Sequence, residues 1–173
     1  MALLFTQTEA NIAVKTKSMY TEVLNHLPYK SSFRFVDTII ALDENGVIGE
    51  YSLKPGSFFY EDHFPGNPVT PGVIITEIMA QIGLVVLGIY LVLNETRGNL
   101  PAGKKIFPLL TSNEIEFYKM VLPGEKVRVT SKKQYFRFNK LKCSVQMVNE
   151  KGEMVAKGIF AGMIKQGEKN DAV

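Results

Sequence analysis

The sequence predicts one α+β domain in which an antiparallel sheet of about six strands wraps around a single long central helix. Three observations favour this fold class. Residues 72–94 form a strongly apolar segment with the length of a long helix. Strand-like segments separated by tight turns lie on both sides of it. A chain of 173 residues, 46% of them hydrophobic, can bury one good core, and two full domains are not expected.

We expect the domain to span residues 22–165, between an N-terminal extension over 1–21 and a C-terminal tail over 166–173. The extension has a short apolar patch but neither a basic start nor a long apolar core, so it does not resemble a secretion signal. Cys143 is the sole cysteine, and no Cys/His cluster has the spacing of a zinc site. A reducing compartment, the cytoplasm, is therefore the expected location.

The first part of the chain predicts a short helix and a β-hairpin. Residues 20–27 have a helical pattern that ends before a proline, because the residue preceding a proline disfavours helical geometry. Two strand patterns, 33–42 and 47–53, then flank the pair Asn45-Gly46. We expect this pair to supply the positive φ angles of a two-residue hairpin turn.

Four further strands are predicted after residue 112. Proline, glycine and asparagine residues mark the turns between them. The expected strands cover residues 114–120, 126–138, 141–148 and 154–164.

The apolar segment over 72–94 is typical either of a membrane span or of a helix buried in a core. Its uncharged run between Glu77 and Glu95 has 17 residues, at the lower limit for a span, and contains the polar Gln81. Because six strands present a large apolar face that one long helix can fill, we expect a buried helix and no membrane span.

Charge is distributed unevenly along the chain. Residues 1–93 hold five basic and nine acidic residues, a net −4, whereas residues 94–173 hold fifteen and eight, a net +7. The basic half suits an acidic partner, although most lysines on strands simply face solvent. No nucleic-acid motif accompanies these charges, so nucleic-acid binding is not expected. Five basic residues fall on two adjacent strands, and some of them are expected to form one basic patch near the mouth of a substrate tunnel: Lys132, Lys133, Arg137, Lys140 and Lys142.

The segment before the apolar helix carries the first chemical signal. Three prolines within seven residues, at 65, 68 and 71, stiffen the chain that follows His63. A stiff loop that holds a histidine ahead of a buried helix indicates preorganised geometry. Taken alone, His63 is more often a packed, hydrogen-bonded loop residue than a catalytic group.

The expected helix start supplies a second signal. Thr70 is a suitable N-cap and Pro71 suits the first helical position, so the N–H of Gly72 is left without an intrahelical partner. A ligand can approach this N–H closely, because glycine has no side chain, and the positive end of the helix dipole favours an oxygen that gains negative charge. The pattern fits an oxyanion site and an ordinary helix start equally well.

Glu77 supplies a third signal, because it stands in the second turn of a helix that is otherwise almost uncharged. Burial disfavours the ionised form of a carboxyl group, and a protonated carboxyl is what a general acid needs. Gln81 lies four residues later on the same helix face and can orient the carboxyl group. The alternative is a glutamate that reaches solvent or makes a structural hydrogen bond.

Together these residues provide a base, an acid and an oxyanion donor, the set required for β-elimination next to a thioester. His63 would remove the proton from the carbon beside the carbonyl group. Negative charge on the carbonyl oxygen would be held by the Gly72 N–H, and Glu77 would protonate the departing hydroxyl.

These segments resemble the FabZ-type 3-hydroxyacyl-acyl-carrier-protein dehydratases of the hotdog fold. The similarity covers about residues 22–165, and weaker matches lie at 27–29, 35–37 and 117–125. The family pattern is met by His63-Phe64-Pro65-Gly66, by Asn67 to Val73 and by Glu77-Ile78-Met79-Ala80-Gln81.

The resemblance implies dehydration of 3-hydroxyacyl chains to trans-2-enoyl chains on an acidic acyl carrier protein, with no metal and no cofactor. It implies His63 and Glu77 as catalytic residues and Gly72 and Gln81 as substrate-binding residues. It further implies an acyl tunnel and a homodimer whose sites each combine the histidine of one chain with the glutamate of the other, with assembly beyond the dimer left open. Glutamate at 77 resembles this branch rather than the FabA-type dehydratase/isomerases, which carry aspartate.

Some residues depart from the family pattern. Asp62 stands where the family usually has glycine, and with Glu61 it is expected either to raise the proton affinity of His63 or to crowd the loop. Ser31-Ser32 replace a frequent proline. Two alternatives therefore remain beside the dehydratase: a hotdog thioesterase, and a non-catalytic acyl-binding or dimer-partner protein.

Overall fold

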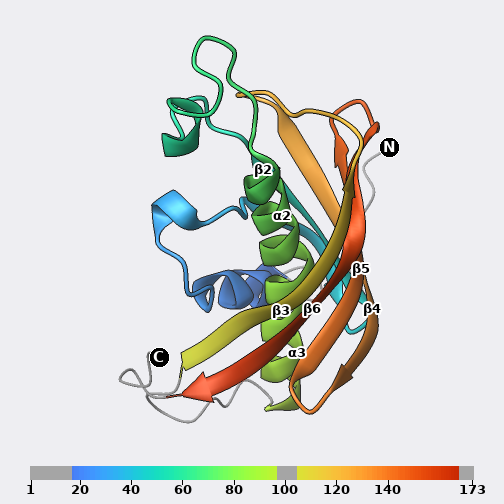
Figure 1. Ribbon diagram of the computed structural model, residues 1–173. Coiled ribbons are helices and arrows are strands. Elements are labelled where there is room, and N and C mark those ends of the chain that lie inside the picture. Colours follow the sequence, from blue (N-terminus) through green and yellow to red (C-terminus); the bar gives the residue numbers. More distant parts are fainter. Residues whose placement is uncertain (1–16, 97–104, 168–173) are drawn as a thin grey trace, which may run out of the picture.

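Six antiparallel strands curve around one long helix in the computed structural model, which describes residues 17–96 and 105–167 (Figure 1). The predicted α+β hotdog arrangement is confirmed. The strands are β1 (Thr38–Asp43), β2 (Gly46–Ser52), β3 (Lys105–Phe117), β4 (Lys126–Arg137), β5 (Lys140–Asn149) and β6 (Met154–Gly167). The helices are a helix over 17–25, η1 (Ser31–Phe33), η2 (Phe58–Tyr60), α2 (Gly72–Ala80), η3 (Gln81–Val86) and α3 (Leu87–Glu95).

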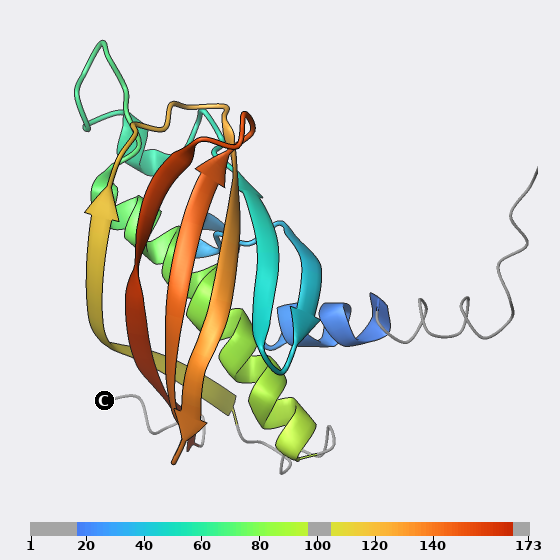
Figure 2. The ribbon, with the colours of Figure 1, turned by 90° about the vertical axis from the view of Figure 1, so that its right-hand side faces the viewer.

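The strands form one sheet in the order β1-β2-β4-β5-β6-β3, so that β1 and β3 are its two edges (Figure 2). Every neighbouring pair is antiparallel. Side chains alternate between the faces, as a strand requires: Val127 and Val129 are buried under the helix, and Arg128 between them faces solvent.

The segment from Gly72 to Glu95 is one continuous helix of 24 residues along the inner face of the sheet. By length and composition it could cross a membrane, but 78% of its most apolar stretch is buried within the fold. The buried-helix interpretation of the sequence is therefore confirmed, because the apolar side chains already have partners in the sheet.

The middle of this helix, η3, is a π-helix, which the sequence analysis did not predict. Helix and sheet lie close together here. A Cβ atom on Gly83 would lie 2.8 Å from a methyl carbon of Val145, and the Ser131 hydroxyl donates a 2.7 Å hydrogen bond to the Gly83 carbonyl oxygen. This bond gives a buried polar partner to a carbonyl group in the irregular part of the helix.

The turn of the first hairpin differs from the prediction. Asn45 and Gly46 do not adopt positive φ angles, and the Asp43 carboxylate instead accepts hydrogen bonds from both of their N–H groups at 2.7 and 3.1 Å. An aspartate at this position stabilises a turn without left-handed residues. The positive φ angles of a two-residue hairpin occur between β4 and β5, at Phe138 (51°) and Asn139 (59°).

Two strand boundaries also differ from the prediction. The expected strand over 114–120 starts earlier, at Lys105, and contains Pro108, which an edge strand tolerates because one side of its backbone makes no ladder bonds. The expected strand over 33–42 begins only at Thr38, because the Phe35 N–H donates to the Gln81 side chain rather than to a strand.

The helix over 17–25 covers the β1 edge of the sheet (Figure 2). Its Tyr20 hydroxyl accepts a 3.1 Å hydrogen bond from the Leu42 N–H, and Val23 is fully buried in the core. The helix crosses the expected start of the domain at residue 22. The rest of the expected extension, residues 1–16, and most of the expected tail, residues 168–173, lie outside the described residues.

Candidate functional site

The loop over 61–70 projects beyond the end of the sheet, next to the start of α2 (Figure 1). Two of its residues, Phe64 (φ 61°) and Gly66 (φ 82°), have left-handed backbone conformations that turn the chain sharply. The Phe64 ring lies against the His63 ring, with 4.2 Å between the ring centroids.

His63 is held in one tautomer by the backbone. Its Nδ1 atom lies 2.8 Å from the carbonyl oxygen of Val69. Because a carbonyl oxygen only accepts hydrogen bonds, Nδ1 carries the proton and neutral His63 presents the lone pair of Nε2. The half-buried ring is thus oriented as a base requires.

The helix start differs in part from the prediction. Pro71, not Thr70, occupies the N-cap position, and Gly72 is the first helical residue. Among the described contacts, the Thr70 hydroxyl does not cap the helix and is hydrogen-bonded to the Tyr60 hydroxyl at 2.7 Å. Within the described residues no group accepts a hydrogen bond from the Gly72 N–H, as the sequence analysis expected. The Phe117 ring lies over this glycine, 3.5 Å from where its Cβ would be.

Glu77 and Gln81 lie together on the helix, as predicted from their spacing. The Gln81 side-chain nitrogen donates to Glu77 Oε1 and to the Phe33 carbonyl oxygen, and its oxygen accepts from the Phe35 N–H, each at 2.8 Å. Gln81 is fully buried. The polar atoms of Gln81 are thus engaged by Glu77 and by the backbone, and its expected contact with substrate stays a prediction.

Glu77 faces a cavity of about 200 Å³ beneath the β3 edge. Among the residues that line it, Glu77 alone carries a charge. Tyr29, which the sequence analysis noted only as part of a family match, also lines the cavity, and burial together with the negative charge of Glu77 raises the pKa of its phenol. Its apolar walls include Leu84, Leu109, Leu141 and Ile164.

His63 does not line the cavity next to Glu77. The described chain therefore presents two separate groups: a histidine and an open N–H at the loop and helix start, and a carboxyl group at an apolar cavity. Within the described residues, no group of three or more His, Cys, Asp or Glu side chains could hold a metal ion.

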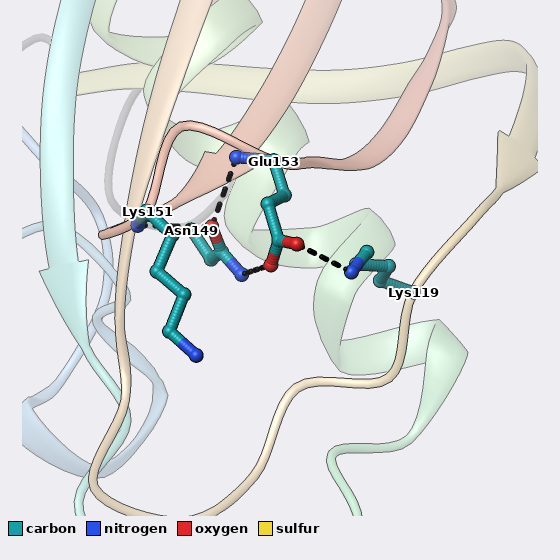
Figure 3. A network of polar contacts seen from close by, with 4 residues as sticks. All are labelled: Lys119, Asn149, Lys151 and Glu153. Carbon is teal, nitrogen blue, oxygen red and sulfur yellow. Dashed lines mark hydrogen bonds and ion pairs between the residues drawn. The ribbon is translucent and has the colours of Figure 1, made fainter.

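A network of polar side chains holds the segment that follows β3 (Figure 3). Lys119 Nζ donates to Glu153 Oε1 at 2.7 Å, and the other Glu153 oxygen accepts from the Asn149 side chain at 2.9 Å. The network ties the turn between β5 and β6 to the segment whose Val121 carbonyl oxygen accepts a 2.8 Å hydrogen bond from the Thr70 N–H. It therefore supports the base of the His63 loop.

The predicted basic patch lies far from the His63 loop of the same chain. Lys126 pairs with Ser52, close to where that loop segment begins, whereas Arg137 and Lys140 pair at the opposite end of the sheet. Arg137 lies eleven residue steps along β4 from Lys126, or about 36 Å at about 3.3 Å per step. The Glu77 cavity is nearer to the patch, because Leu141 and Met163 line it and Lys140 pairs with Met163. A patch near the mouth of the tunnel therefore stays a prediction.

A sequence profile of the FabA-like domain matches residues 27–161 of this chain. The chain belongs to the FabA-like domain family. Proteins named 3-hydroxyacyl-acyl-carrier-protein dehydratase FabZ are similar to it. The protein from Caldicellulosiruptor saccharolyticus is 33% identical over 150 residues, which cover 84% of this chain and 97% of the relative. The protein from Rhodospirillum rubrum is 32% identical over 157 residues, which cover 90% and 92%.

Solved structures with similar folds support the architecture of this FabA-like domain. The dehydratase heterocomplex ApeI:P from Xenorhabdus doucetiae has a TM-score of 0.67 at 13% identity and covers 86% of this chain and 93% of that one. The protein smu.793 from Streptococcus mutans, bound to acetyl CoA, has a TM-score of 0.55 at 16% identity and covers 84% and 100%. At such identities the likeness shows the fold alone, whereas the family match and the FabZ relatives confirm the resemblance found in the sequence.

Proposed function

We propose that this chain removes water from 3-hydroxyacyl thioesters carried on acyl carrier protein and forms trans-2-enoyl thioesters. The observation that carries the proposal is the carboxyl group of Glu77, the only carboxyl group in the wall of an otherwise mostly apolar cavity, held by a fully buried glutamine in a chain of this family. An acyl chain suits the apolar wall, and a polar group at its entrance suits the 3-hydroxyl.

In the proposed reaction, Nε2 of His63 takes the proton from C2 of the acyl chain. The Gly72 N–H stabilises the negative charge on the thioester oxygen, Glu77 gives its proton to the 3-hydroxyl, and the C3–O bond breaks as the C2–C3 double bond forms. Each proton-transfer group contributes roughly 10²–10⁴ in rate, and an oxyanion donor of this type about 10²–10³.

The working unit of this proposal is a homodimer. The Glu77 cavity lies beneath β3, whose exposed leucines Leu109 and Leu110 form part of its wall. A second copy that packs on this edge would cover these leucines and bring its own His63 loop to the cavity. The separation of His63 from the cavity within one chain is the observation that favours a shared site.

The proposed partner outside the dimer is an acyl carrier protein in the cytoplasm. The FabZ relatives are named for substrates on this carrier. An acidic carrier would be attracted by the net +7 charge of residues 94–173.

The function is tested by incubating the purified protein with 3-hydroxyacyl carrier proteins of several chain lengths and following the products by mass spectrometry. Loss of one water from the carrier-bound chain is the expected result, and the His63→Ala variant is the matched control. Release of a free acid with a bare carrier thiol would instead identify a thioesterase. An unchanged substrate bound to the protein would identify an acyl-binding protein.

A further inference from the structure

The loop that carries His63 is closed at its base by one buried hydrogen bond. Tyr60 ends η2 and Thr70 precedes the helix start, so nine residues lie between them. Their hydroxyl oxygens are 2.7 Å apart, and the two residues are only 6% and 3% exposed. Most of the nine loop residues are exposed; His63 is half-buried and Val69 is buried.

The peptide group between Val69 and Thr70 links this closure to the imidazole of His63. Its carbonyl oxygen accepts the hydrogen bond from His63 Nδ1, and its N–H donates to the Val121 carbonyl oxygen, both at 2.8 Å. A peptide group is planar and trans, so its C=O and N–H point in opposite directions. Rotation of this peptide plane would weaken the bond from His63 Nδ1 and the bond to the Val121 carbonyl oxygen at once. A contact that holds Thr70 in place therefore also holds the Val69 carbonyl oxygen that accepts from His63.

The remainder of the loop adds little further anchoring. Within 61–68, the Asn67 N–H donates a backbone hydrogen bond to the Phe64 carbonyl oxygen, and this bond is internal to the loop. Among the described contacts, the loop is tied to the body of the protein mainly where Tyr60, Thr70 and Val121 meet. The ring of Tyr60 is itself held by packing against Phe59, with centroids 4.5 Å apart.

We propose that Tyr60 and Thr70 are a positioning pair that holds His63 in its Nδ1-protonated tautomer with Nε2 in place. The proposal rests on the proposed role of His63 as base. The proposal requires no contact of Tyr60 or Thr70 with the substrate. Without the pair, Thr70 and the Val69 carbonyl oxygen gain freedom, the His63 ring loses its fixed acceptor, and a displacement of about 1 Å at a reacting group can lower the rate about 100-fold.

A purely structural pair would behave differently. Removal of one hydroxyl leaves its buried partner unsatisfied and destabilises the fold, whereas replacement of both by apolar groups of similar shape is nearly neutral. If the bond only satisfies two buried hydroxyls, activity should therefore follow stability. If it positions His63, the double replacement should restore stability and leave activity low.

The test compares wild type, Tyr60→Phe, Thr70→Val and the double variant by Tm, by kcat and KM on a short 3-hydroxyacyl thioester, and by ¹⁵N NMR of labelled histidine. The chain contains only two histidines, so a His26→Gln variant assigns both signals. We expect each single variant to lower Tm by several degrees and kcat by about 10-fold or more with little change in KM. The His63 signals should shift away from the pure Nδ1–H tautomer.

The double variant distinguishes a positioning pair from a purely structural pair. A Tm close to wild type together with a low kcat and an altered His63 tautomer supports the positioning pair. Recovery of kcat along with Tm, or an unchanged His63 tautomer in all three variants, overturns it. The tautomer measurement needs no substrate, so it remains decisive for the pair even if wild type shows no dehydratase activity and the proposed function fails.

Discussion

The β1 edge of the sheet has six residues and a covering helix, whereas the β3 edge has 13 residues and exposed leucines. On β1, the Tyr20 hydroxyl accepts a hydrogen bond from the Leu42 N–H, which would otherwise be free to pair with another strand. On β3, Leu109 and Leu110 face outward with no described segment beyond them. Within the described residues, the chain itself covers the β1 edge and leaves the β3 edge uncovered.

In the proposed dimer, this difference places assembly and chemistry on the same side of the molecule. An open, apolar edge strand attracts other chains unless something specific pairs with it. The Glu77 cavity lies under this edge, so a second copy that covers β3 would also enclose the carboxyl group. Because β1 is covered, pairing of this kind would stop at a closed dimer rather than continue as a chain of subunits.

The largest expected effect tests whether the β3 edge joins two halves of one site. His63→Ala and Glu77→Ala should each lower kcat by about 10²–10⁴, because each removes one proton-transfer group. A mixture of the two purified variants should regain about a quarter of the wild-type activity after random exchange in a two-fold dimer, because half the molecules would be mixed and carry one native site. Steady-state rates before and after exchange provide the measurement.

Subunit exchange must be verified independently in that experiment, for example by native mass spectrometry of differently tagged chains. Complete exchange without any recovery of rate would place both groups in one chain. The β3 edge would then have no part in forming the site.

A second prediction contrasts the two edges directly. The Leu109→Lys/Leu110→Lys variant should weaken dimerisation by about 100-fold or more, because full burial of a leucine stabilises by roughly 1.5–3 kcal/mol and the introduced charges resist burial. Dehydration should be lost with the dimer. Sedimentation equilibrium over a range of concentrations measures the assembly.

Ile40→Lys on β1 is the matched control, since Ile40 is 43% exposed and Leu109 is 47% exposed. The control variant should remain dimeric and active. A monomeric Ile40→Lys protein, or an unaffected β3 variant, would reverse the assignment of the two edges.

The sequence predicted the features that depend on side-chain pattern. The continuous apolar segment over 72–94 was sufficient to predict the buried helix, and the strand patterns with their turn residues were sufficient to predict the sheet. The four-residue spacing from Glu77 to Gln81 was sufficient to predict their contact. The His63 acceptor, Val69, is a backbone carbonyl group, so no residue type could indicate it.

The features missed by the sequence analysis depend on contacts between distant segments. The π-helix η3 occurs where Gly83 meets Ser131 and Val145, which follow it by about 50 and 60 residues. The first half of β3 contains Pro108 and was missed because a proline usually argues against a strand unless the strand is known to lie at an edge. Thr70 suited a helix cap by its position alone, but Tyr60 engages its hydroxyl.

A third prediction concerns the closed edge. Tyr20→Phe should lower the free energy of unfolding by about 1 kcal/mol, because it removes the partner of the Leu42 N–H at a part-buried position. Dimerisation and kcat should stay at wild-type values, since the β1 edge lies outside the proposed interface. Urea unfolding and the dehydration assay measure the two quantities, and a change in kcat without a change in stability would contradict this separation.

The smallest expected effect concerns the carrier protein, which we expect to dock on the central strands between the two edges. Lys132→Glu/Lys133→Glu reverses two charges of the basic patch on β4, whereas Lys54→Glu/Lys151→Glu reverses two at the end of the sheet near the His63 loop.

Exposed charges act mainly by steering the encounter with the carrier protein, and they are screened within about 10 Å at 0.1 M salt. The first variant should therefore lower kcat/KM several-fold on carrier-bound substrate at low salt, with little loss at high salt. A short thioester without the carrier should react at the wild-type rate, because Lys132 and Lys133 do not line the Glu77 cavity. An effect confined to the second variant would place docking at the loop end instead, and an equal loss on both substrates would indicate damage to the fold or the site.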